Sequence, residues 1–313
     1  MNATIGLDLG GTKVLGLAVA DDGQVLADVR LPTPSGGDAI ITTLASAVSA
    51  LQAQVPEATR VGVGAPGLVD GEGILRFAPN LPGVVDLDVP GLLLARVPSI
   101  GVRIENDASC AGIAEWAFGA AQGSSHALLV TLGTGIGGGI ITAGGLYRGA
   151  HGFAGEIGHM VVNAAGPLCV CGQRGCWERY ASGSGLARLA RQAALAGRAG
   201  RAVELAGGAP DAVRGEHVTA AAREGDGEAL EVMKELGWWL ALGLSNLANV
   251  LDVERFVIGG GLVEAGDLLL DPAREAFALM IEGGSHRPVP SILPATLGER
   301  AGAIGAAVLA AGP

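Results

Sequence analysis

The sequence is poor in aromatic and charged residues. Only 4% of its 313 residues are aromatic and 16% are charged, whereas 49% are hydrophobic and 53 are glycine. The core must therefore be built from aliphatic side chains, with many turns between the elements. A chain of this length exceeds one typical domain, so we expect two.

The features of a membrane or secreted protein are also missing. The chain opens directly on a strand-like run, so we expect no targeting segment. Two uncharged stretches are poor membrane spans, because residues 116–147 are rich in glycine and residues 236–251 are short and read as a buried helix. We expect a cytoplasmic protein with reduced cysteines and no membrane partner.

Positive charge is scarce as well. The net charge is -11 and the isoelectric point is about 4.9. Such a chain is poorly suited to nucleic-acid backbones or anionic lipid, so we expect no nucleic-acid partner. It can still bind a nucleotide locally, through backbone N–H groups and magnesium.

The hydrophobic pattern predicts one arrangement twice. A strand, a turn with Gly and Thr, and a second strand occur at residues 4–20 and again at 127–141. Two such halves predict a two-lobed α/β enzyme with a cleft, with domains at 1–118 (joined by a C-terminal helix at about 300–313) and 119–299. Strands are expected at 4–8, 14–20, 25–30, 61–63, 102–105, 127–131, 138–141, 145–148 and 255–258. Helices are expected at 40–54, 108–118, 186–196, 219–224, 229–251 (in one part or two) and 301–311.

One histidine and three of the four cysteines are grouped at fixed offsets: His159, Cys169, Cys171 and Cys176. Zinc readily takes one imidazole and three thiolates in a tetrahedron. A cluster of buried thiols is the alternative, and a disulfide would leave an odd thiol. We predict a structural zinc site that folds this loop and fixes the flanking carboxylates of the segments GEIGH and CWE.

Three glycine-rich turns are candidate nucleotide sites. Residues 8–13 (DLGGTK) place a carboxylate and an ammonium beside backbone N–H groups, so that Asp8 could hold Mg²⁺ and Lys13 a phosphate. Residues 133–139 (GTGIGGG) and 259–261 (GGG) are the other two, and neither is a Walker loop. Each alone could be an ordinary turn, the first with a salt-bridged lysine. The three together favour a nucleotide.

Asp107 is the candidate catalytic base. It stands between a predicted strand and a predicted helix. Phosphoryl transfer to an alcohol needs a carboxylate near the attacking hydroxyl, and Asn106 can exchange hydrogen bonds with sugar hydroxyls. The alternative is that Asp107 only caps the helix.

Five of these segments occur in an order typical of a known family: DLGGTK (8–13), END (105–107), GTGIGGG (133–139), GEIGH (155–159) and C-x-C-G-x-x-G-C-x-E (169–178). Together they resemble the ROK family of sugar kinases and sugar-responsive repressors, and within it the bacterial glucokinases. The resemblance spans nearly the whole chain, and the cysteine run is its most specific part. It implies an actin-like, hexokinase-like (ribonuclease H-like) ATPase fold, with ATP and sugar in an interlobe cleft, and a homodimer or dimer of dimers.

The resemblance also implies roles for individual residues. Asp107 would be the general base for the 6-hydroxyl of glucose, and one ring nitrogen of His159 would bind zinc while the other binds the sugar. The implied sugar ligands are Asn80, Asn106, Asp107, Glu156, His159 and Glu178, and the implied nucleotide contacts are Asp8, Gly10, Gly11, Thr12, Lys13, Thr134, Gly135 and Gly260. One departure is Ala108-Ser109-Cys110, where the family often has Ala-Asn or Ala-Ala. We expect Cys110 to be a small buried hydrophobe.

The resemblance favours ATP-dependent phosphorylation of glucose, and alternatives remain open. The sugar could be N-acetylmannosamine, fructose or allose, since specificity lies in loop geometry, and polyphosphate could be the donor. A sugar-sensing regulator would need a DNA-binding segment ahead of the kinase-like body. The DLGGTK turn at residue 8 leaves no room for one, and the acidic charge disfavours it too.

Overall fold

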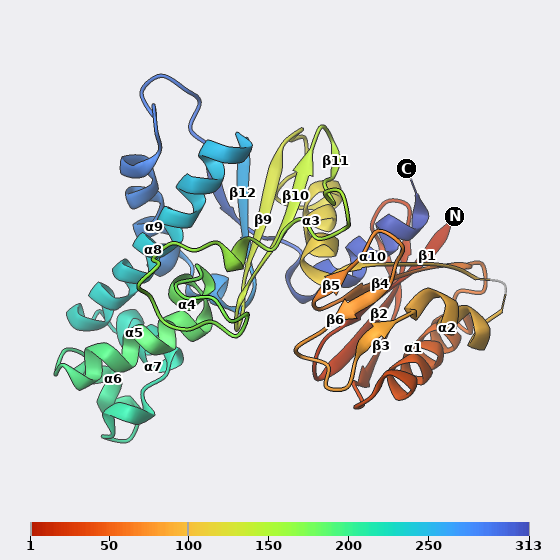
Figure 1. Cartoon of the computed structure of the whole chain (residues 1–313), viewed down its shortest axis with the longest axis horizontal. Helices are drawn as coiled ribbons and strands as arrows, with labels where there is room; N and C mark the ends of the chain where they lie inside the picture. The colour runs from red at the N-terminus through yellow and green to blue at the C-terminus, as the bar shows by residue number, and fades with distance from the viewer. Residues whose placement is uncertain (1, 99, 313) are drawn as a thin grey trace. The chain divides into compact units, whose positions relative to one another are not determined.

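The computed structural model describes residues 2–98 and 100–312, which form two compact units (Figure 1). The first unit comprises Met1–Leu129, Gly139–Gly155 and Thr296–Pro313, and the second comprises Val130–Gly138 and Glu156–Ala295. The sequence places domain limits at 118/119 and about 300. Those limits stay a prediction.

The first unit is built on a five-stranded sheet with the order β3-β2-β1-β4-β8. The three N-terminal strands form the predicted antiparallel meander, and β4 and β8 add in parallel to β1. The bounds are β1 Ala3–Leu9, β2 Lys13–Ala20, β3 Val25–Pro32, β4 Arg60–Ala65 and β8 Gly101–Asn106.

Helices cover both faces of this sheet, because the alternation along its strands sends apolar side chains to each face. Ile5 and Leu7 of β1 share a core with α1 (Gly37–Gln52) and α2 (Val89–Arg96). Leu15 and Leu17 of β2 pack instead against α3 (Asp107–Phe118) and α10 (Ala301–Ala311). The C-terminal helix therefore packs within the first unit, as the sequence predicts.

The contact between α10 and the sheet is very close. A Cβ atom at Gly6 or at Gly62 would lie 1.8 Å from a carbonyl oxygen of α10. Glycine at these two strand positions lets the helix backbone rest directly on β1 and β4. Any larger residue there would push α10 away from the sheet.

A second five-stranded sheet has the order β11-β10-β9-β12-β13. Its strands are β9 Ala127–Leu132, β10 Ile136–Thr142, β11 Gly145–Leu146, β12 Arg255–Gly259 and β13 Ser291–Pro294. Strand by strand, this is the order of the first sheet, with β9 in the place of β1 and β12 in the place of β4. The predicted internal repeat is therefore confirmed at the level of topology.

Apart from β12, β13 and its portions of β9 and β10, the second unit is mainly helical. Its longest helix, α8, is continuous, so the division that the sequence allowed within it is wrong. Phe256 of β12 and Phe277 of α9 stack edge to face at 5.9 Å, which holds α9 against the sheet. The helices are α4 Glu178–Ala181, α5 Gly183–Leu195, α6 Gly200–Leu205, α7 Gly215–Arg223, α8 Gly227–Leu251 and α9 Asp267–Met280, with 3-10 helices η1 Ile157–His159, η2 Pro210–Ala212 and η3 Gly261–Ala265.

Several elements differ from the sequence predictions. A small antiparallel sheet, α9 and β13 had no predicted counterpart, and the predicted strand at 145–148 shortens to the two residues of β11. The small sheet consists of β5 Leu68–Val69, β6 Leu75–Phe77 and β7 Val85–Leu87. Within the described part of the chain, no helix combines the length and apolar character that crossing a bilayer requires.

Candidate functional site

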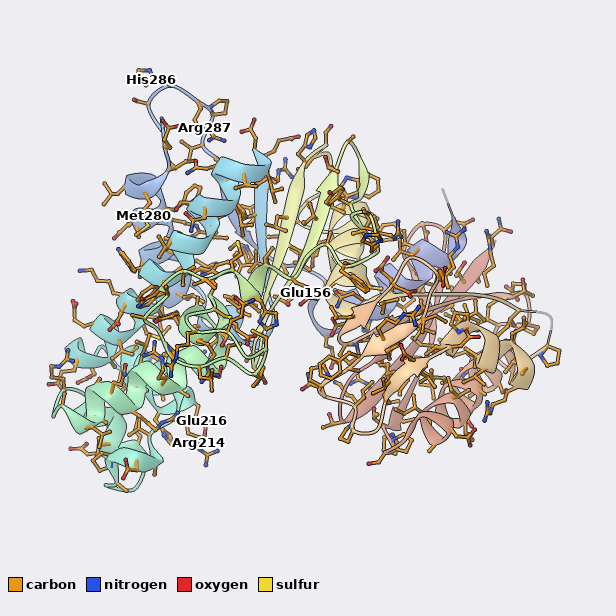
Figure 2. All side chains as sticks on the ribbon, viewed as in Figure 1. Glu156, Arg214, Glu216, Met280, His286 and Arg287 are labelled. Carbon is orange, nitrogen blue, oxygen red and sulfur yellow. The ribbon has the colours of Figure 1, made fainter. Side chains whose placement is uncertain are left out.

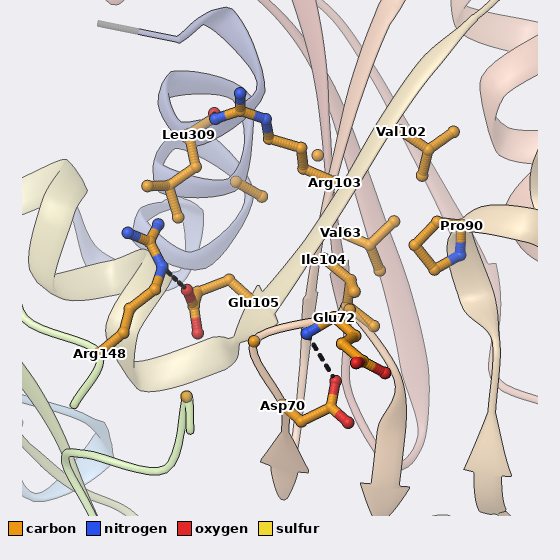
Figure 3. Close-up of a pocket in the computed structure, with 15 residues that line it drawn as sticks. Val63, Asp70, Glu72, Pro90, Val102, Arg103, Ile104, Glu105, Arg148 and Leu309 are labelled. Carbon is orange, nitrogen blue, oxygen red and sulfur yellow. Dashed lines mark hydrogen bonds and ion pairs between the residues drawn. The ribbon is translucent and has the colours of Figure 1, made fainter. Parts of the chain in front are cut away.

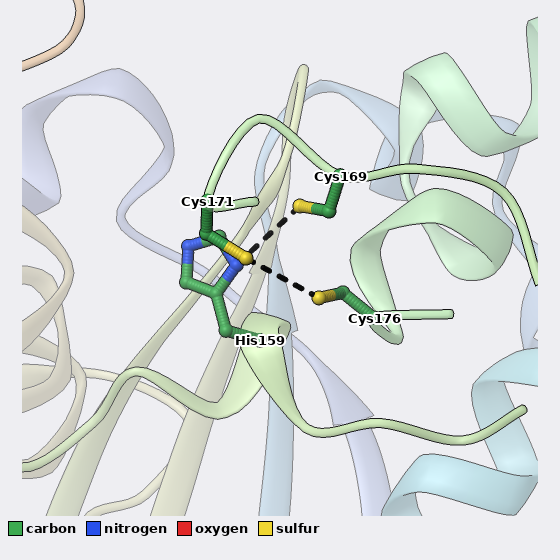
Figure 4. Close-up of side chains that lie close together, drawn as sticks. All are labelled: His159, Cys169, Cys171 and Cys176. Atoms are coloured by element: carbon green, nitrogen blue, oxygen red, sulfur yellow. Dashed lines mark hydrogen bonds between the residues drawn. The ribbon is translucent and has the colours of Figure 1, made fainter. Parts of the chain in front are cut away.

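The four predicted metal ligands come together in the second unit (Figure 4). Their ligand atoms all lie within 4.8 Å of one another. The Sγ atoms of Cys171 and Cys176 are 3.5 Å apart, and Cys169 Sγ is 3.7 Å from His159 Nδ1. Two sulfurs bound to one tetrahedral zinc lie about 3.8 Å apart, so the cluster fits zinc. All four cysteines of the chain are free thiols, which excludes the disulfide alternative.

The loop reaches this geometry through tight turns and a buried anchor. Gly172 and Gly175, between the cysteines, have φ values of 88° and 75°, a backbone conformation that glycine adopts readily and that allows the tight turns of the loop. Cys176 pairs with Val161 in an isolated bridge. Trp177, which is completely buried, donates its indole N–H to the carbonyl of Trp239 at 2.7 Å. The residues on either side of Trp177 are thereby held against α8.

Two carboxylates lie beside the imidazole. His159 Nδ1, which faces the cysteines, is 3.9 Å from Glu178 Oε1, and Nε2 is 3.9 Å from Glu156 Oε2. Partial burial raises the pKa of Glu156, and the Glu178 carboxylate raises it further against the opposing effect of His159. The two ring nitrogens thus face different groups, as the double role of His159 requires.

Glu178 is also linked to a metal ligand and to a glycine turn. Its Oε1 accepts a hydrogen bond from Cys169 Sγ at 3.0 Å. A Cβ atom at Gly135 would lie 2.4 Å from Glu178 Oε2. The GTG turn between β9 and β10 therefore packs directly on the carboxylate, whereas Thr134 beside it is exposed.

The DLGGTK turn in the first unit joins β1 to β2. It is closed by a hydrogen bond from Gly10 N to Lys13 O at 2.9 Å, and the Thr33 hydroxyl donates to the Gly10 carbonyl at 2.7 Å. Burial raises the pKa of Asp8 to about 7, with a further rise from the Asp107 carboxylate and a smaller opposing effect of Lys13. A buried carboxylate with a like charge nearby is well suited to bind a divalent cation.

Asn80, a sugar ligand that the family resemblance implies, lies beside this turn. A Cβ atom at Gly11 would lie 3.2 Å from the Asn80 carbonyl oxygen. The structure thus brings together Asp8, Gly11, Asn80 and Asp107 within the first unit.

Asn106 rather than Asp107 is the N-cap of α3. Its Oδ1 accepts from Ser109 N at 3.0 Å, and its Nδ2 donates to the Gly67 carbonyl at 3.1 Å. Asp107 is the first residue of the helix, and its Oδ1 accepts from Ala108 N at 2.8 Å. The interpretation of Asp107 as a helix cap is therefore wrong, because its neighbour has that role. Cys110 is fully buried, as expected, and burial raises the pKa of its thiol.

An ion pair between the buried Glu105 and the exposed Arg148 precedes Asp107 and could not be predicted from the sequence. Arg148 Nε donates to Glu105 Oε2 at 2.5 Å (Figure 3). The other oxygen of Glu105 accepts from Asn106 N at 2.9 Å. Glu105 is only 6% exposed. The pair borders a cavity of about 330 Å³ and fixes the backbone immediately before Asp107.

A second cavity, of about 490 Å³, lies in the second unit beside the GGG segment. Gly261 and Leu262 line it, together with Arg214 and Glu216 near the start of α7 (Figure 2). Gly260 is held against the end of β9, since a Cβ atom there would lie 2.6 Å from the Leu132 backbone. The side chains that line the cavity come from segments far apart in the chain, so the sequence predicts Gly260 but none of these side chains.

Comparison with known proteins identifies the family of this chain. The profile of the ROK family matches residues 4–312, and the chain belongs to this family. It is similar to the glucokinase of Streptomyces coelicolor, with 42% identity over 316 residues, 100% of this chain and 99% of the relative. It is 32% identical to an N-acetylmannosamine kinase of Escherichia coli over 99% of this chain and 98% of the relative.

A solved structure of the same family has a similar fold. The ROK family glucokinase of Streptomyces griseus, in complex with glucose and AMPPNP, has a TM-score of 0.86 and 40% identity, and the match covers 100% of both chains. With the repeated sheet order, this confirms the predicted actin-like α/β fold.

Proposed function

We propose that this protein is an ATP-dependent glucokinase that transfers the γ-phosphoryl group to the 6-hydroxyl of glucose. The observation that carries the proposal is the full-length similarity to the glucokinases of Streptomyces coelicolor and Streptomyces griseus. The metal-ligand cluster and the pairing of Asp8 with Asp107 supply the chemistry that such a reaction needs.

Asp107 is the proposed general base. It accepts the proton of the 6-hydroxyl as the oxygen attacks the γ-phosphorus, and base catalysis of this kind is worth roughly 10²–10⁴-fold in rate. Its position at the first turn of α3 is held by the Asn106 cap and, behind it, by Glu105 with Arg148. This support leaves the orientation of Asp107 little freedom.

The proposed donor contacts are backbone and side-chain groups of the glycine turns: Asp8, Gly10, Gly11, Thr12, Lys13, Thr134, Gly135 and Gly260. Mg²⁺ held by Asp8 would neutralise phosphate charge. The cavity beside Gly261 is the proposed place of the nucleoside, since its mixed lining offers apolar contact and both signs of charge.

The proposed sugar ligands are Asn80, Asn106 and Asp107 in the first unit and Glu156, His159 and Glu178 in the second. Zinc on His159, Cys169, Cys171 and Cys176 would fold the loop that carries Glu178 and fix the tautomer of His159. Nε2 of His159 would then remain for a sugar hydroxyl. We further propose a cytoplasmic homodimer or dimer of dimers.

A coupled kinase assay tests the proposal. Glucose, N-acetylmannosamine, fructose and allose would be compared as acceptors, each with ATP and with polyphosphate as donors. We expect the highest kcat/KM for glucose with ATP. A preference for N-acetylmannosamine, which the Escherichia coli relative makes the second candidate, would sink the glucokinase assignment but leave the sugar-kinase class intact.

A further inference from the structure

An ion cluster lies beside the DLGGTK turn of the first unit. Glu299, in the 3-10 helix η4 (Gly298–Arg300), accepts a hydrogen bond from Lys13 Nζ at 2.8 Å. The same carboxylate accepts from both terminal nitrogens of Arg30, one of them at 3.2 Å. Lys13 begins β2 and Arg30 lies on the antiparallel neighbour β3. Two cations from adjacent strands therefore converge on one anion.

The cluster is accessible and permanently charged. The side chains of Lys13, Arg30 and Glu299 are 50%, 46% and 51% exposed. Hydrogen bonds from Arg30 and then from Lys13 lower the pKa of Glu299 to about 2, so the carboxylate is ionised throughout the neutral range. Exposed ion pairs are individually weak, so a ligand with several negative charges can displace Glu299.

Glu299 holds Lys13 in the way that a phosphate oxygen would. If Lys13 contacts the donor, as the proposed function has it, the donor must compete with this internal carboxylate. We propose that Glu299 is a built-in competitor of the phosphate donor, which lowers the affinity of the DLGGTK turn for polyanions. The inference rests on the proposed function and names the residue that tunes its donor selectivity.

The consequence is largest for donors that carry the most charge. Lys13, Arg30 and Glu299 together carry one net positive charge. Lys13 and Arg30 without Glu299 carry two. The second cation, Arg30, would then be free to contact a further phosphate group. Glu299 therefore disfavours long inorganic polyphosphates more than it disfavours ATP, whose remaining affinity comes from its nucleoside.

The test is Glu299→Gln, with Glu224→Gln as the matched control. Glu224 is also an exposed carboxylate with a lowered pKa, and its partner, Arg201, is remote in sequence from the turn. Calorimetry of the full chain with inorganic tripolyphosphate measures the Kd directly and does not depend on catalytic activity. We expect Glu299→Gln to lower the Kd about two- to tenfold, with a steeper dependence on salt, and Glu224→Gln to leave it unchanged. Adding Lys13→Met to Glu299→Gln should remove the gain.

Three results would overturn the inference. The Kd for tripolyphosphate could be unchanged in Glu299→Gln, it could be higher, or the gain in affinity could survive the addition of Lys13→Met. A higher Kd would mean that Glu299 orients Lys13 for the donor instead of competing with it. If the wild-type chain does not phosphorylate glucose from ATP, the proposed function fails, yet the tripolyphosphate titration still decides the role of Glu299.

Discussion

Gly135 lies so close to Glu178 that a methyl group at position 135 would come within 2.4 Å of Glu178 Oε2. The first residue belongs to a proposed donor turn and the second is a proposed sugar ligand. The turn between β9 and β10 therefore sets the position of a group on the acceptor side, within one unit of the fold.

Replacing Gly135 by alanine should accordingly impair sugar binding. We expect Gly135→Ala to raise the KM for glucose about tenfold, as Glu178→Gln should, because a charge-assisted hydrogen bond is worth roughly 1.5–3 kcal/mol. Gly133→Ala is the matched control, since a Cβ atom there meets nothing within 4 Å. The measurement is steady-state kinetics with glucose varied at saturating ATP. Equal glucose KM values for the two alanine variants would contradict the coupling.

Asp107→Asn should abolish turnover and leave glucose binding largely intact. The amide cannot accept the proton of the 6-hydroxyl, whereas the other proposed sugar ligands are unchanged. We expect kcat to fall at least about 100-fold, while the Kd for glucose, from calorimetry, changes much less. A variant with more than about a tenth of wild-type kcat would exclude Asp107 as the base.

Cys171→Ser should cost the protein its zinc and its activity together. Cys171 Sγ lies 3.5 Å from that of Cys176, and a serine hydroxyl is a poor substitute for a thiolate on zinc. Elemental analysis of the purified chain should give one zinc in the wild type and in Cys110→Ser, and less in Cys171→Ser. Active wild-type protein without zinc would end the assignment.

Asp8→Asn should stabilise the protein at alkaline pH. The pKa of Asp8 is raised from 3.8 to about 7, so the unfolded state releases its proton at lower pH than the folded state does. The contribution of Asp8 to stability is complete below pH 4 and is lost as the pH rises to about 7.

Melting curves without magnesium or nucleotide check this. Asp8→Asn should melt a few degrees above the wild type at pH 8, and the difference should shrink toward pH 4. Glu57→Gln, at an exposed carboxylate, should show no such trend. A difference that stays constant with pH would refute the link to ionisation of Asp8.

Local signals made much of the fold predictable. The strands β1 and β2 alternate or run apolar between clear turn residues, and all four proposed metal ligands lie within one short segment of chain. The helix α9 was missed because Pro272 lies inside it, and proline ordinarily argues against a helix interior. The small sheet was missed because strands of two or three residues carry no readable period.

Ion pairs between residues far apart in the chain could not be predicted from one sequence. The partners Glu105 and Arg148 are 43 positions apart, and Lys13 and Glu299 are 286 apart. Nothing local marks either residue as the partner of the other. The prediction of Asp107 as the N-cap of α3 was wrong for a different reason. Asn106 and Asp107 are adjacent, and both residue types favour the N-cap position.

The two sheets share one strand order, but the connections between their corresponding strands differ greatly in length. Between β3 and β4 the first sheet carries α1, whereas between β11 and β12 the second carries the cysteine loop and α4 to α8. The longer connection leaves the strand order of both sheets unchanged. Its length and sequence can therefore vary without any change in how the strands are paired.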